Sequence, residues 1–184
     1  MLTELTVSGG KYRILRLLGH GKGGYSYLAE GPDGPVVVKQ IHHEPCDYYQ
    51  FGDKMEAERR DYGRLRAAGI RVPEMLAFDR ENERLVKEFI AEETIFDLVE
   101  KGGSAEAWLP EVRAMAAKAR AAGLNIDYFP TNFIARDGLL WYVDYECNEY
   151  MDEWNFENWG VKYWSRTPEF LAYLEQREAQ DGRN

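Results

Sequence analysis

Three glycines in the N-terminal part of the chain have a spacing that suits phosphate binding. Gly19, Gly21 and Gly24 form a GxGxxG pattern within LLGHGKGGYSYLAE. Because glycine has no Cβ, backbone N–H groups in such a turn can approach phosphate oxygens closely. A dinucleotide-binding fold would require a helix next, but the following residues are typical of a strand, and Lys22 precedes Gly23 rather than the Ser or Thr of a Walker loop. We expect a strand–loop–strand flap, and the alternative is an ordinary hairpin loop.

A lysine and a glutamate further along have the chemistry of an ion pair that grips phosphate. Lys39 ends a run of three valines, a setting that removes water from its ammonium group and favours an anionic partner. Glu58 shares a helical stripe with Met55, Tyr62 and Leu65, so its carboxylate is expected to point inward and to need a cation. We predict that Lys39 pairs with Glu58. The alternatives are a structural lysine at a strand edge and a glutamate at the rim of the core.

An amide and a carboxylate in the second half form a candidate magnesium site, with a second carboxylate close by in the sequence. The segment NIDYFPTNFI places Asp127 and Asn132 five residues apart, and Asp137-Gly138 then supplies the positive φ angles of a two-residue type I′ hairpin loop. This loop sets a register in which Asn132 faces Val143, so Asn132 and Asp144 lie at the same open end of two strands. Hard oxygen ligands of this kind suit Mg²⁺. The alternative is a pair of turn-forming side chains at strand ends.

The elements that would position these residues are mainly strands in the first half and helices in the second. The pattern predicts antiparallel strands over 11–41, a helix over 48–68, and a strand pair over 75–79 and 84–90. It then predicts a short helix over 94–101, a helix over 110–122 and a hairpin over 132–143. The last forty residues are expected to be helical, with Thr167, Pro168 and Glu169 opening the final helix. The fold class is therefore α+β.

Composition limits the classes of function. The chain has 184 residues, 45% of them hydrophobic and 14% aromatic, which favours one folded domain over disorder. A formal charge of −9 argues against a nucleic-acid backbone or an anionic membrane surface as partner. Cys46 and Cys147 form no CxxC pair, and no apolar run is long enough to cross a bilayer. We expect free thiols and a cytoplasmic protein with no nucleic-acid and no membrane partner.

Taken in order, motifs between residue 12 and about residue 146 resemble those of the protein-kinase-like superfamily, in particular a minimal, atypical bacterial-type serine/threonine kinase. GHGKGGYSYLA resembles the glycine-rich flap, VVVK the strand that carries the phosphate-binding lysine, and KEFI the hinge. NIDYFPTN resembles the catalytic loop, and VDYE resembles the segment with the metal-binding aspartate. The resemblance implies a single two-lobed domain over 1–184. Its N-lobe, about 1–90, would hold an antiparallel sheet with one helix, and its C-lobe, about 91–184, would be much reduced and mostly helical.

The resemblance also implies a role for each candidate residue, with ATP and Mg²⁺ as substrate and cofactor. Asp127 would orient the acceptor hydroxyl, and Lys39 and Glu58 would act with it in catalysis. The nucleotide would be held by Gly19, Gly21, Gly24, Lys39, Glu88 and Ile90, and the metal by Asn132 and Asp144.

Two departures from the kinase pattern leave the acceptor open. Phe129 stands where serine/threonine kinases carry a lysine near the γ-phosphate, and Asp144-Tyr145-Glu146 resembles the string found in choline and aminoglycoside kinases. We favour a serine/threonine protein kinase that transfers the γ-phosphate of ATP to a hydroxyl. The alternatives are a small-molecule kinase of the aminoglycoside or choline type and a catalytically silent pseudokinase that acts as a nucleotide-binding interaction module.

The aromatic residues between positions 145 and 164 are expected to form core, because large rings bury the most apolar area per residue. An acceptor pocket or a docking patch built from the same rings is the alternative. Acidic residues in this segment, Glu146 to Glu157, would suit a cationic acceptor or a basic peptide, against the simpler reading of a solvated acidic face.

Overall fold

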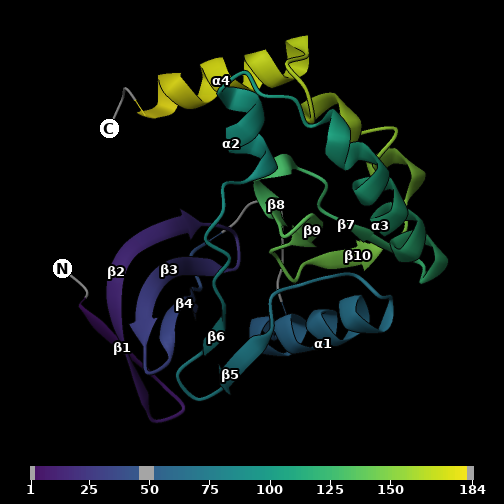
Figure 1. Cartoon of the computed structure of the whole chain (residues 1–184). Helices are drawn as coiled ribbons and strands as arrows, with labels where there is room; N and C mark the ends of the chain where they lie inside the picture. Colours follow the sequence, from purple (N-terminus) through teal and green to yellow (C-terminus); the bar gives the residue numbers. More distant parts are fainter. Residues whose placement is uncertain (1–2, 46–51, 182–184) are drawn as a thin grey trace. The chain divides into compact units, whose positions relative to one another are not determined.

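A computed structural model describes residues 3–45 and 52–181 (Figure 1). The chain divides into two compact units. The first unit comprises Met1–Gly63 and Pro73–Ile90, and the second comprises Arg64–Val72 and Ala91–Asn184. The predicted helical residues 48–51 and the predicted free thiol of Cys46 lie outside the described residues.

The first unit is built on a curled antiparallel sheet of six strands (Figure 1). The strands are β1 (Glu4–Val7), β2 (Gly10–His20), β3 (Gly24–Gly31), β4 (Gly34–Ile41), β5 (Met75–Asp79) and β6 (Arg84–Glu88), in the order β1-β2-β3-β4-β6-β5. The strands predicted over 11–41 and the pair predicted after residue 75 are confirmed, although β6 ends at Glu88 rather than at residue 90. Strand β1 was not predicted.

One face of this sheet carries an apolar core. Four of the strands, β1, β3, β4 and β6, contribute its buried residues, which are Leu5, Val7, Ala29, Val38 and Val86. Side chains alternate between the two faces of a strand, so a residue next to Val38 in β4 points to the opposite face. Because Val38 points into this core, the side chain of Lys39 projects from the opposite face of the sheet.

A tight turn joins β1 to β2 and is fixed to the far edge of the sheet. Ser8 and Gly9 have φ angles of 48° and 82°, and the Ser8 N–H donates to Asp79 Oδ2 over 2.7 Å. The same carboxylate accepts the Asn82 N–H at 2.9 Å and its side-chain amide at 3.0 Å. These hydrogen bonds, those from Asn82 first, lower the pKa of Asp79 to about 2.

Helix α1 spans Lys54–Ala67, and its residues up to Gly63 belong to the first unit. Its start is later than predicted, because Asp53 caps it: the Asp53 carboxylate accepts the Glu56 N–H at 3.0 Å and its carbonyl accepts the Ala57 N–H at 3.0 Å. The helix is followed by Gly69, whose φ of 79° ends it as the sequence predicts.

The second unit combines three helices with two small antiparallel sheets. The helices are α2 (Ile95–Glu100), α3 (Leu109–Ala121) and α4 (Pro168–Asp181). Strand β7 (Leu124–Ile126) pairs with β10 (Cys147–Glu149), and β8 (Phe133–Arg136) pairs with β9 (Leu139–Tyr142). Short 3₁₀ helices cover Glu106–Trp108, Pro130–Asn132, Asp152–Trp154 and Gly160–Tyr163. Within residues 3–45 and 52–181, no helix has both the length and the apolar character to cross a lipid bilayer.

The predicted hairpin and helices of the second unit are confirmed, including its turn and caps. Arg136 pairs with Leu139, and the two residues between them, Asp137 and Gly138, have φ angles of 54° and 72°, as a type I′ loop requires. At the start of α4, the Thr167 hydroxyl accepts the Phe170 N–H at 3.1 Å.

The prediction that the last forty residues are helical is wrong for residues 145–166. This stretch contains β10 and two 3₁₀ turns. Among the described residues from 145 to 181, only α4 is α-helical. Asparagine side chains hold the local turns: Asn155 Oδ1 accepts the Asn158 N–H at 2.7 Å, and the Asn158 amide donates to the Asp152 carbonyl at 2.8 Å. Such side-chain bonds offer the backbone an alternative to a helix.

The aromatic residues of this stretch divide between core and surface. Tyr145, Phe156 and Trp164 are buried, and the Trp164 indole donates to the Tyr128 carbonyl at 2.8 Å. Trp154, by contrast, is 46% exposed. The expected core role therefore holds for the three buried rings. Cys147 is a free, buried thiol, as expected.

Candidate functional site

The glycine-rich segment forms a tight turn between β2 and β3 in the first unit. The Gly21 N–H donates to the Gly24 carbonyl at 3.0 Å. A side chain at Gly24 would overlap the Gln40 carbonyl of the neighbouring strand, so strand packing alone requires glycine there. Gly19 and Gly21 instead border open space with no atom within 4 Å of an added Cβ. This open space is where a phosphate group could approach the backbone.

The predicted pair between Lys39 and Glu58 is present. Lys39 Nζ donates to Glu58 Oε1, and the two side chains are only 12% and 13% exposed. An added Cβ at Gly23 would lie 3.6 Å from Lys39 Nζ, so the glycine-rich turn passes beside the ammonium group. Within the described part of the chain, the second oxygen of Glu58, Oε2, is buried and accepts no hydrogen bond. The first unit thus brings a fixed cation next to the turn.

A second lysine, which the sequence reasoning missed, holds the same turn to helix α1. Lys54 is 8% exposed, and its Nζ donates to the Lys22 carbonyl at 3.2 Å and to the His42 carbonyl at 2.5 Å. Lys54 opens α1 one helical turn before Glu58. The available signal was a lysine at a helix N-terminus, where a cation is unfavourable unless another group binds it.

The predicted hinge residues lie at the end of β6. Glu88 pairs with Val36 in the sheet, and its N–H donates to the Glu74 carbonyl at 2.9 Å. Ile90 is 4% exposed. Their predicted contact with the adenine edge stays a prediction.

In the second unit, a hydrogen bond joins two of the predicted site residues, Asp127 and Asn132, and the third, Asp144, follows the residue that faces Asn132 in the hairpin register. Asp127 Oδ1 accepts the Phe129 N–H at 3.0 Å, and the Asp127 carbonyl accepts the side-chain amide of Asn132 at 3.3 Å. The Val143 N–H donates to the Asn132 carbonyl at 2.9 Å, which confirms the predicted register and places Asp144 next to it. Because Asn132 donates through Nδ2, its Oδ1 is the atom that it can offer to a cation.

A buried tyrosine, also missed by the sequence reasoning, lies beneath this network. The Tyr142 side chain is fully buried; its hydroxyl donates to the Glu146 carbonyl at 2.6 Å and accepts the Asp127 N–H at 3.3 Å. Burial raises the pKa of Tyr142 well above its usual range, and the negative charges of Asp144 and Asp127 raise it further. The hydroxyl therefore stays protonated and remains a donor. The sequence signal for this supporting role was the position of Tyr142 in the hairpin, two residues before Asp144.

Phe129, which replaces the lysine of the kinase pattern, packs within an aromatic cluster. Its ring centroid lies 4.8 Å from that of Tyr173, 5.2 Å from Tyr163, 5.8 Å from Phe96 and 6.5 Å from Trp159. This position therefore contributes apolar packing in the second unit instead of a positive charge.

The residues fit the groups that the motifs imply. Asp144 and Asn132 offer hard oxygen ligands of the kind that Mg²⁺ prefers, and they are adjacent in the hairpin register. In the first unit, the Lys39 ammonium lies beside a turn that leaves open space at Gly19 and Gly21. Each unit thus assembles one part of the candidate set.

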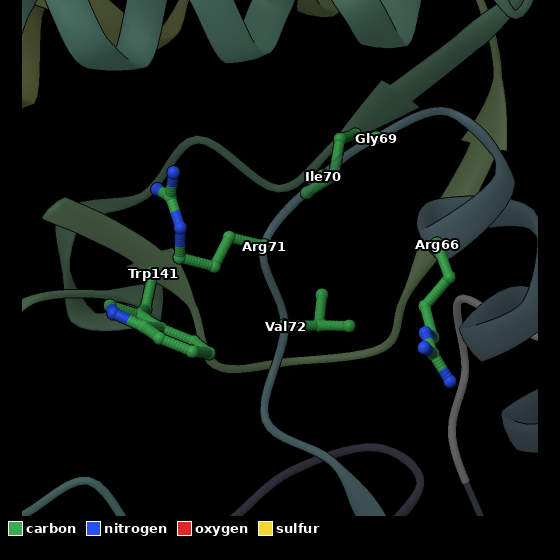
Figure 2. Close-up of a pocket in the computed structure, with 6 residues that line it drawn as sticks. All are labelled: Arg66, Gly69, Ile70, Arg71, Val72 and Trp141. Carbon is green, nitrogen blue, oxygen red and sulfur yellow. The ribbon is translucent and has the colours of Figure 1, made fainter.

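A shallow hollow of about 340 Å³ lies elsewhere in the second unit (Figure 2). It is lined by Arg66, Gly69, Ile70, Arg71, Val72 and Trp141. The Arg71 guanidinium donates to the Leu140 carbonyl at 2.7 Å and lies 5.8 Å from the Trp141 ring centroid. None of the predicted nucleotide-binding or metal-binding residues lines this hollow, so the chemistry of the candidate set does not depend on it.

Comparison with known proteins supports the architecture but no individual residue role. No protein-family model matches the sequence, and no curated protein matches it. Among solved structures, the crystal structure of the BubR1 kinase domain is similar, with a TM-score of 0.56 and 16% sequence identity. The chain has a kinase-like fold. Its curled six-stranded sheet resembles the N-lobe of a kinase.

The similarity covers 82% of this chain and 52% of the BubR1 domain, so the chain spans about half the length of that kinase domain. At this level of identity the likeness concerns the fold alone. The reduced C-lobe and the extent of the domain stay predictions.

Proposed function

We propose that this chain is an ATP- and Mg²⁺-dependent phosphotransferase that moves the γ-phosphoryl group of ATP to a hydroxyl, with a serine or threonine of a protein as the preferred acceptor. The observation that carries the proposal is the largely buried ion pair between Lys39 and Glu58 beside a glycine-rich turn, on a kinase-like fold. In the second unit, the hydrogen bond between Asn132 and Asp127, and the register that puts Asp144 after Val143, support it.

The first unit supplies nucleotide binding in this proposal. Lys39 binds the α and β phosphates while Glu58 holds the lysine in place. The turn at Gly19 and Gly21 presents backbone to the phosphates. The Glu88 carbonyl and the Ile90 N–H hold the adenine edge.

The second unit supplies the reactive groups. Asp127 orients the acceptor hydroxyl and accepts its proton as the oxygen forms a bond to the γ-phosphorus. The bond from that phosphorus to the β–γ bridging oxygen breaks, and ADP leaves with the electron pair. Bound Mg²⁺ would neutralise charge on the phosphates, with Asn132 Oδ1 and the Asp144 carboxylate as its protein ligands. Tyr142 holds the backbone of Asp127 in position.

A small-molecule kinase is the second candidate, favoured by exposed acid groups that follow shortly after Asp144 in the sequence. Glu149, Asp152 and Glu153 are all exposed and follow the Asp144-Tyr145-Glu146 string closely. Carboxylates in this position would attract a cationic amino alcohol or aminocyclitol rather than a neutral peptide hydroxyl.

Incubation of the full chain with γ-labelled ATP and Mg²⁺ tests the proposal. Label on the chain itself or on a casein-like protein supports the protein kinase, and label on an amino alcohol or aminocyclitol supports the second candidate. ATP binding without transfer to any acceptor or to water would overturn both and favour a pseudokinase module.

Variants of the same chain separate chemistry from folding. Lys39→Met and Asp144→Asn should each lower transfer by about 100-fold or more, because each removes charge that stabilises the transition state. Lys11→Met and Asp33→Asn are matched controls, since Lys11 has a side chain 73% exposed and Asp33 lies in an exposed turn. Full activity in Asp144→Asn would refute the metal assignment.

A further inference from the structure

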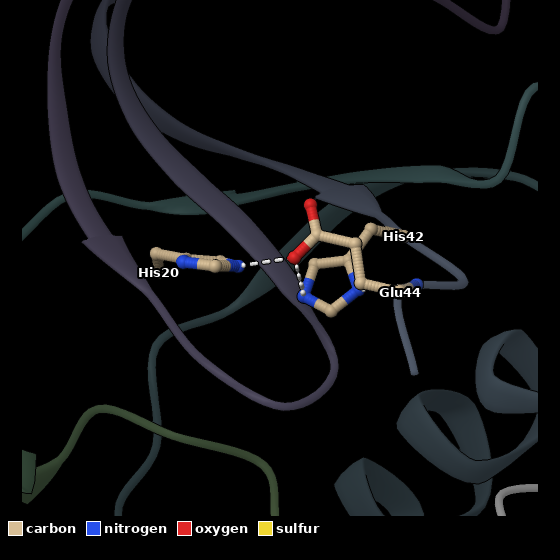
Figure 3. A group of neighbouring side chains, drawn as sticks. All are labelled: His20, His42 and Glu44. Carbon is tan, nitrogen blue, oxygen red and sulfur yellow. Dashed lines mark hydrogen bonds and ion pairs between the residues drawn. The ribbon is translucent and has the colours of Figure 1, made fainter. Parts of the chain in front are cut away.

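Two histidines and a glutamate converge at the edge of the glycine-rich turn, outside the residues assigned above (Figure 3). His20 Nε2 lies 3.0 Å from Glu44 Oε2, and His42 Nε2 lies 3.9 Å from the same oxygen. One potential ligand atom from each of the three residues lies within 4.8 Å of the other two. The imidazole rings meet edge to face, with centroids 5.0 Å apart.

Neighbouring groups already orient these ligands. Tyr25 donates its hydroxyl to Glu44 Oε1, which leaves Oε2 directed at the histidines. The Tyr25 ring stacks on His20 with centroids 4.3 Å apart and planes within 3°. Hydrogen bonds from outer groups of this kind fix the orientation of metal ligands and tune their basicity.

We infer that His20, His42 and Glu44 form a binding site for a divalent transition-metal ion, with Zn²⁺ as the best fit. Two imidazole nitrogens and one carboxylate oxygen are a common ligand set for a zinc ion that keeps a fourth position open. The side chains of His20 and Glu44 are 46% and 48% exposed, so water can fill that position. Mg²⁺ prefers oxygen ligands, so this site differs in chemistry from the one assigned to Asn132 and Asp144.

Zinc binding needs only small shifts of the ligand atoms from their present positions. Ligand atoms around a tetrahedral zinc lie about 3.3 Å apart when metal–nitrogen bonds are about 2.0 to 2.1 Å long. The spacing of 3.0 to 3.9 Å from Glu44 Oε2 to the two Nε2 atoms brackets that value. Because His42 Nδ1 accepts a hydrogen bond, its Nε2 carries the proton and donates to the Gly21 carbonyl at 2.8 Å. Metal binding through Nε2 requires the other tautomer: the proton moves to Nδ1, and the hydrogen bonds to the Gly21 carbonyl and from the Glu44 N–H are both lost.

An ion at this site would fasten the glycine-rich turn to the end of β4. His20 lies between Gly19 and Gly21, whereas His42 and Glu44 follow Ile41, the last residue of β4. Zinc would therefore link the two segments through ligand bonds in place of the present contact between His42 and Gly21. The metal site itself does not depend on the proposed phosphotransfer.

Calorimetric titration of the metal-stripped full chain with ZnCl₂ tests the inference, with excess Mg²⁺ present throughout. We expect one tight site. His20→Gln and Glu44→Gln should each weaken Zn²⁺ binding by more than about tenfold, the lower limit of the loss caused by outer-sphere changes. His43→Gln is the matched control, because His43 adjoins His42 but its imidazole contacts Glu83 at 2.7 Å and is 66% exposed. This variant should bind Zn²⁺ as the parent does.

A nuclear magnetic resonance titration of the histidine rings gives a second readout that does not depend on the variants. The chain has three histidines, so each ring can be assigned. We expect Zn²⁺ to shift the signals of His20 and His42 and to leave those of His43 unchanged. Absence of a stoichiometric zinc site, equal weakening in the His43→Gln variant, or a shift confined to His43 would each overturn the inference.

Discussion

Replacement of Tyr142 by phenylalanine offers a sharp test of how the second unit supports its reactive residues. The change removes one oxygen atom and keeps the ring. It breaks two hydrogen bonds, one donated to the Glu146 carbonyl and one accepted from the Asp127 N–H. The site is fully buried, so water does not replace the lost partner without a rearrangement.

The expected cost follows from these two bonds. At about 1 kcal/mol for each net hydrogen bond, the free energy of unfolding should fall by about 2 kcal/mol. For a chain of this size, 1 kcal/mol corresponds to about 2 to 4 °C in Tm, so Tm should fall by about 4 to 8 °C. Loss of the anchor at Asp127 should also lower kcat, by up to about 100-fold for a displacement near 1 Å, with little effect on the KM for ATP.

Urea unfolding and scanning calorimetry measure the stability change, and transfer of labelled phosphate measures kcat. Tyr163→Phe is the matched control, because the Tyr163 ring packs in the same unit and, among the described residues, its hydroxyl has no hydrogen-bond partner. The control should change the free energy of unfolding by less than about 0.5 kcal/mol. If Tyr142→Phe is as stable as this control, the hydroxyl does not hold the network and our account of Asp127 is wrong.

Three further predictions concern the first unit. Gly24→Ala should lower the free energy of unfolding by about 1 to 3 kcal/mol, because the added methyl overlaps the adjacent strand, whereas Gly21→Ala meets open space and should cost less in the same urea titration. Glu58→Gln should weaken ATP binding, measured by calorimetry, because Lys39 loses the charge that holds it; unchanged affinity would argue against that role. Since the pKa of Asp79 is lowered to about 2, its contribution to stability is present above about pH 4 and is lost as the pH falls toward 2. Asp79→Asn should flatten the pH dependence of stability in that range, and an unchanged acid profile would contradict the assignment.

The sequence predicts best those elements whose local chemistry allows few alternatives. The Asp137-Gly138 pair fixed both the hairpin loop and the register that places Asp144 after Val143. Strand β1 was missed although it carries a comparable signal: Leu5 and Val7 alternate with polar residues and are followed by Ser8-Gly9. Alternation over four residues is short, and the sequence reasoning gave it too little weight.

The segment after Asp144 could not be read from its pattern. Many of its residues are aromatic. Apolar residues are therefore so frequent that some fall at helical spacing by chance, without a true period of 3.6 residues. Its path depends on tertiary contacts that no local rule supplies: a side chain at Gly160 would strike Tyr128 and Phe156, and Trp164 reaches back to the Tyr128 carbonyl. The wrong prediction of helix there follows from this dependence on distant partners.

In the candidate site, too, features set by local sequence patterns were predictable, and features set by contacts between distant segments were not. The pair between Lys39 and Glu58 was predictable because strand alternation and helix periodicity each direct one charged group inward, where each needs the other. Lys54 and Tyr142 were not predictable in this way, since their partners are backbone carbonyl and N–H groups of other segments. Nearly every residue has the same backbone N–H and carbonyl groups, so the residue type does not reveal which of them will be a partner.

Lys54 also gives the first unit a mechanical property. Its ammonium group holds two backbone carbonyls at once, one in the glycine-rich turn and one just after β4, from the first turn of the helix that carries Glu58. Lifting the turn therefore either breaks these bonds or pulls on the start of that helix. Through the Lys54 side chain, the position of the glycine-rich turn is coupled to the ion pair between Lys39 and Glu58. A displacement of the turn should therefore also disturb this ion pair.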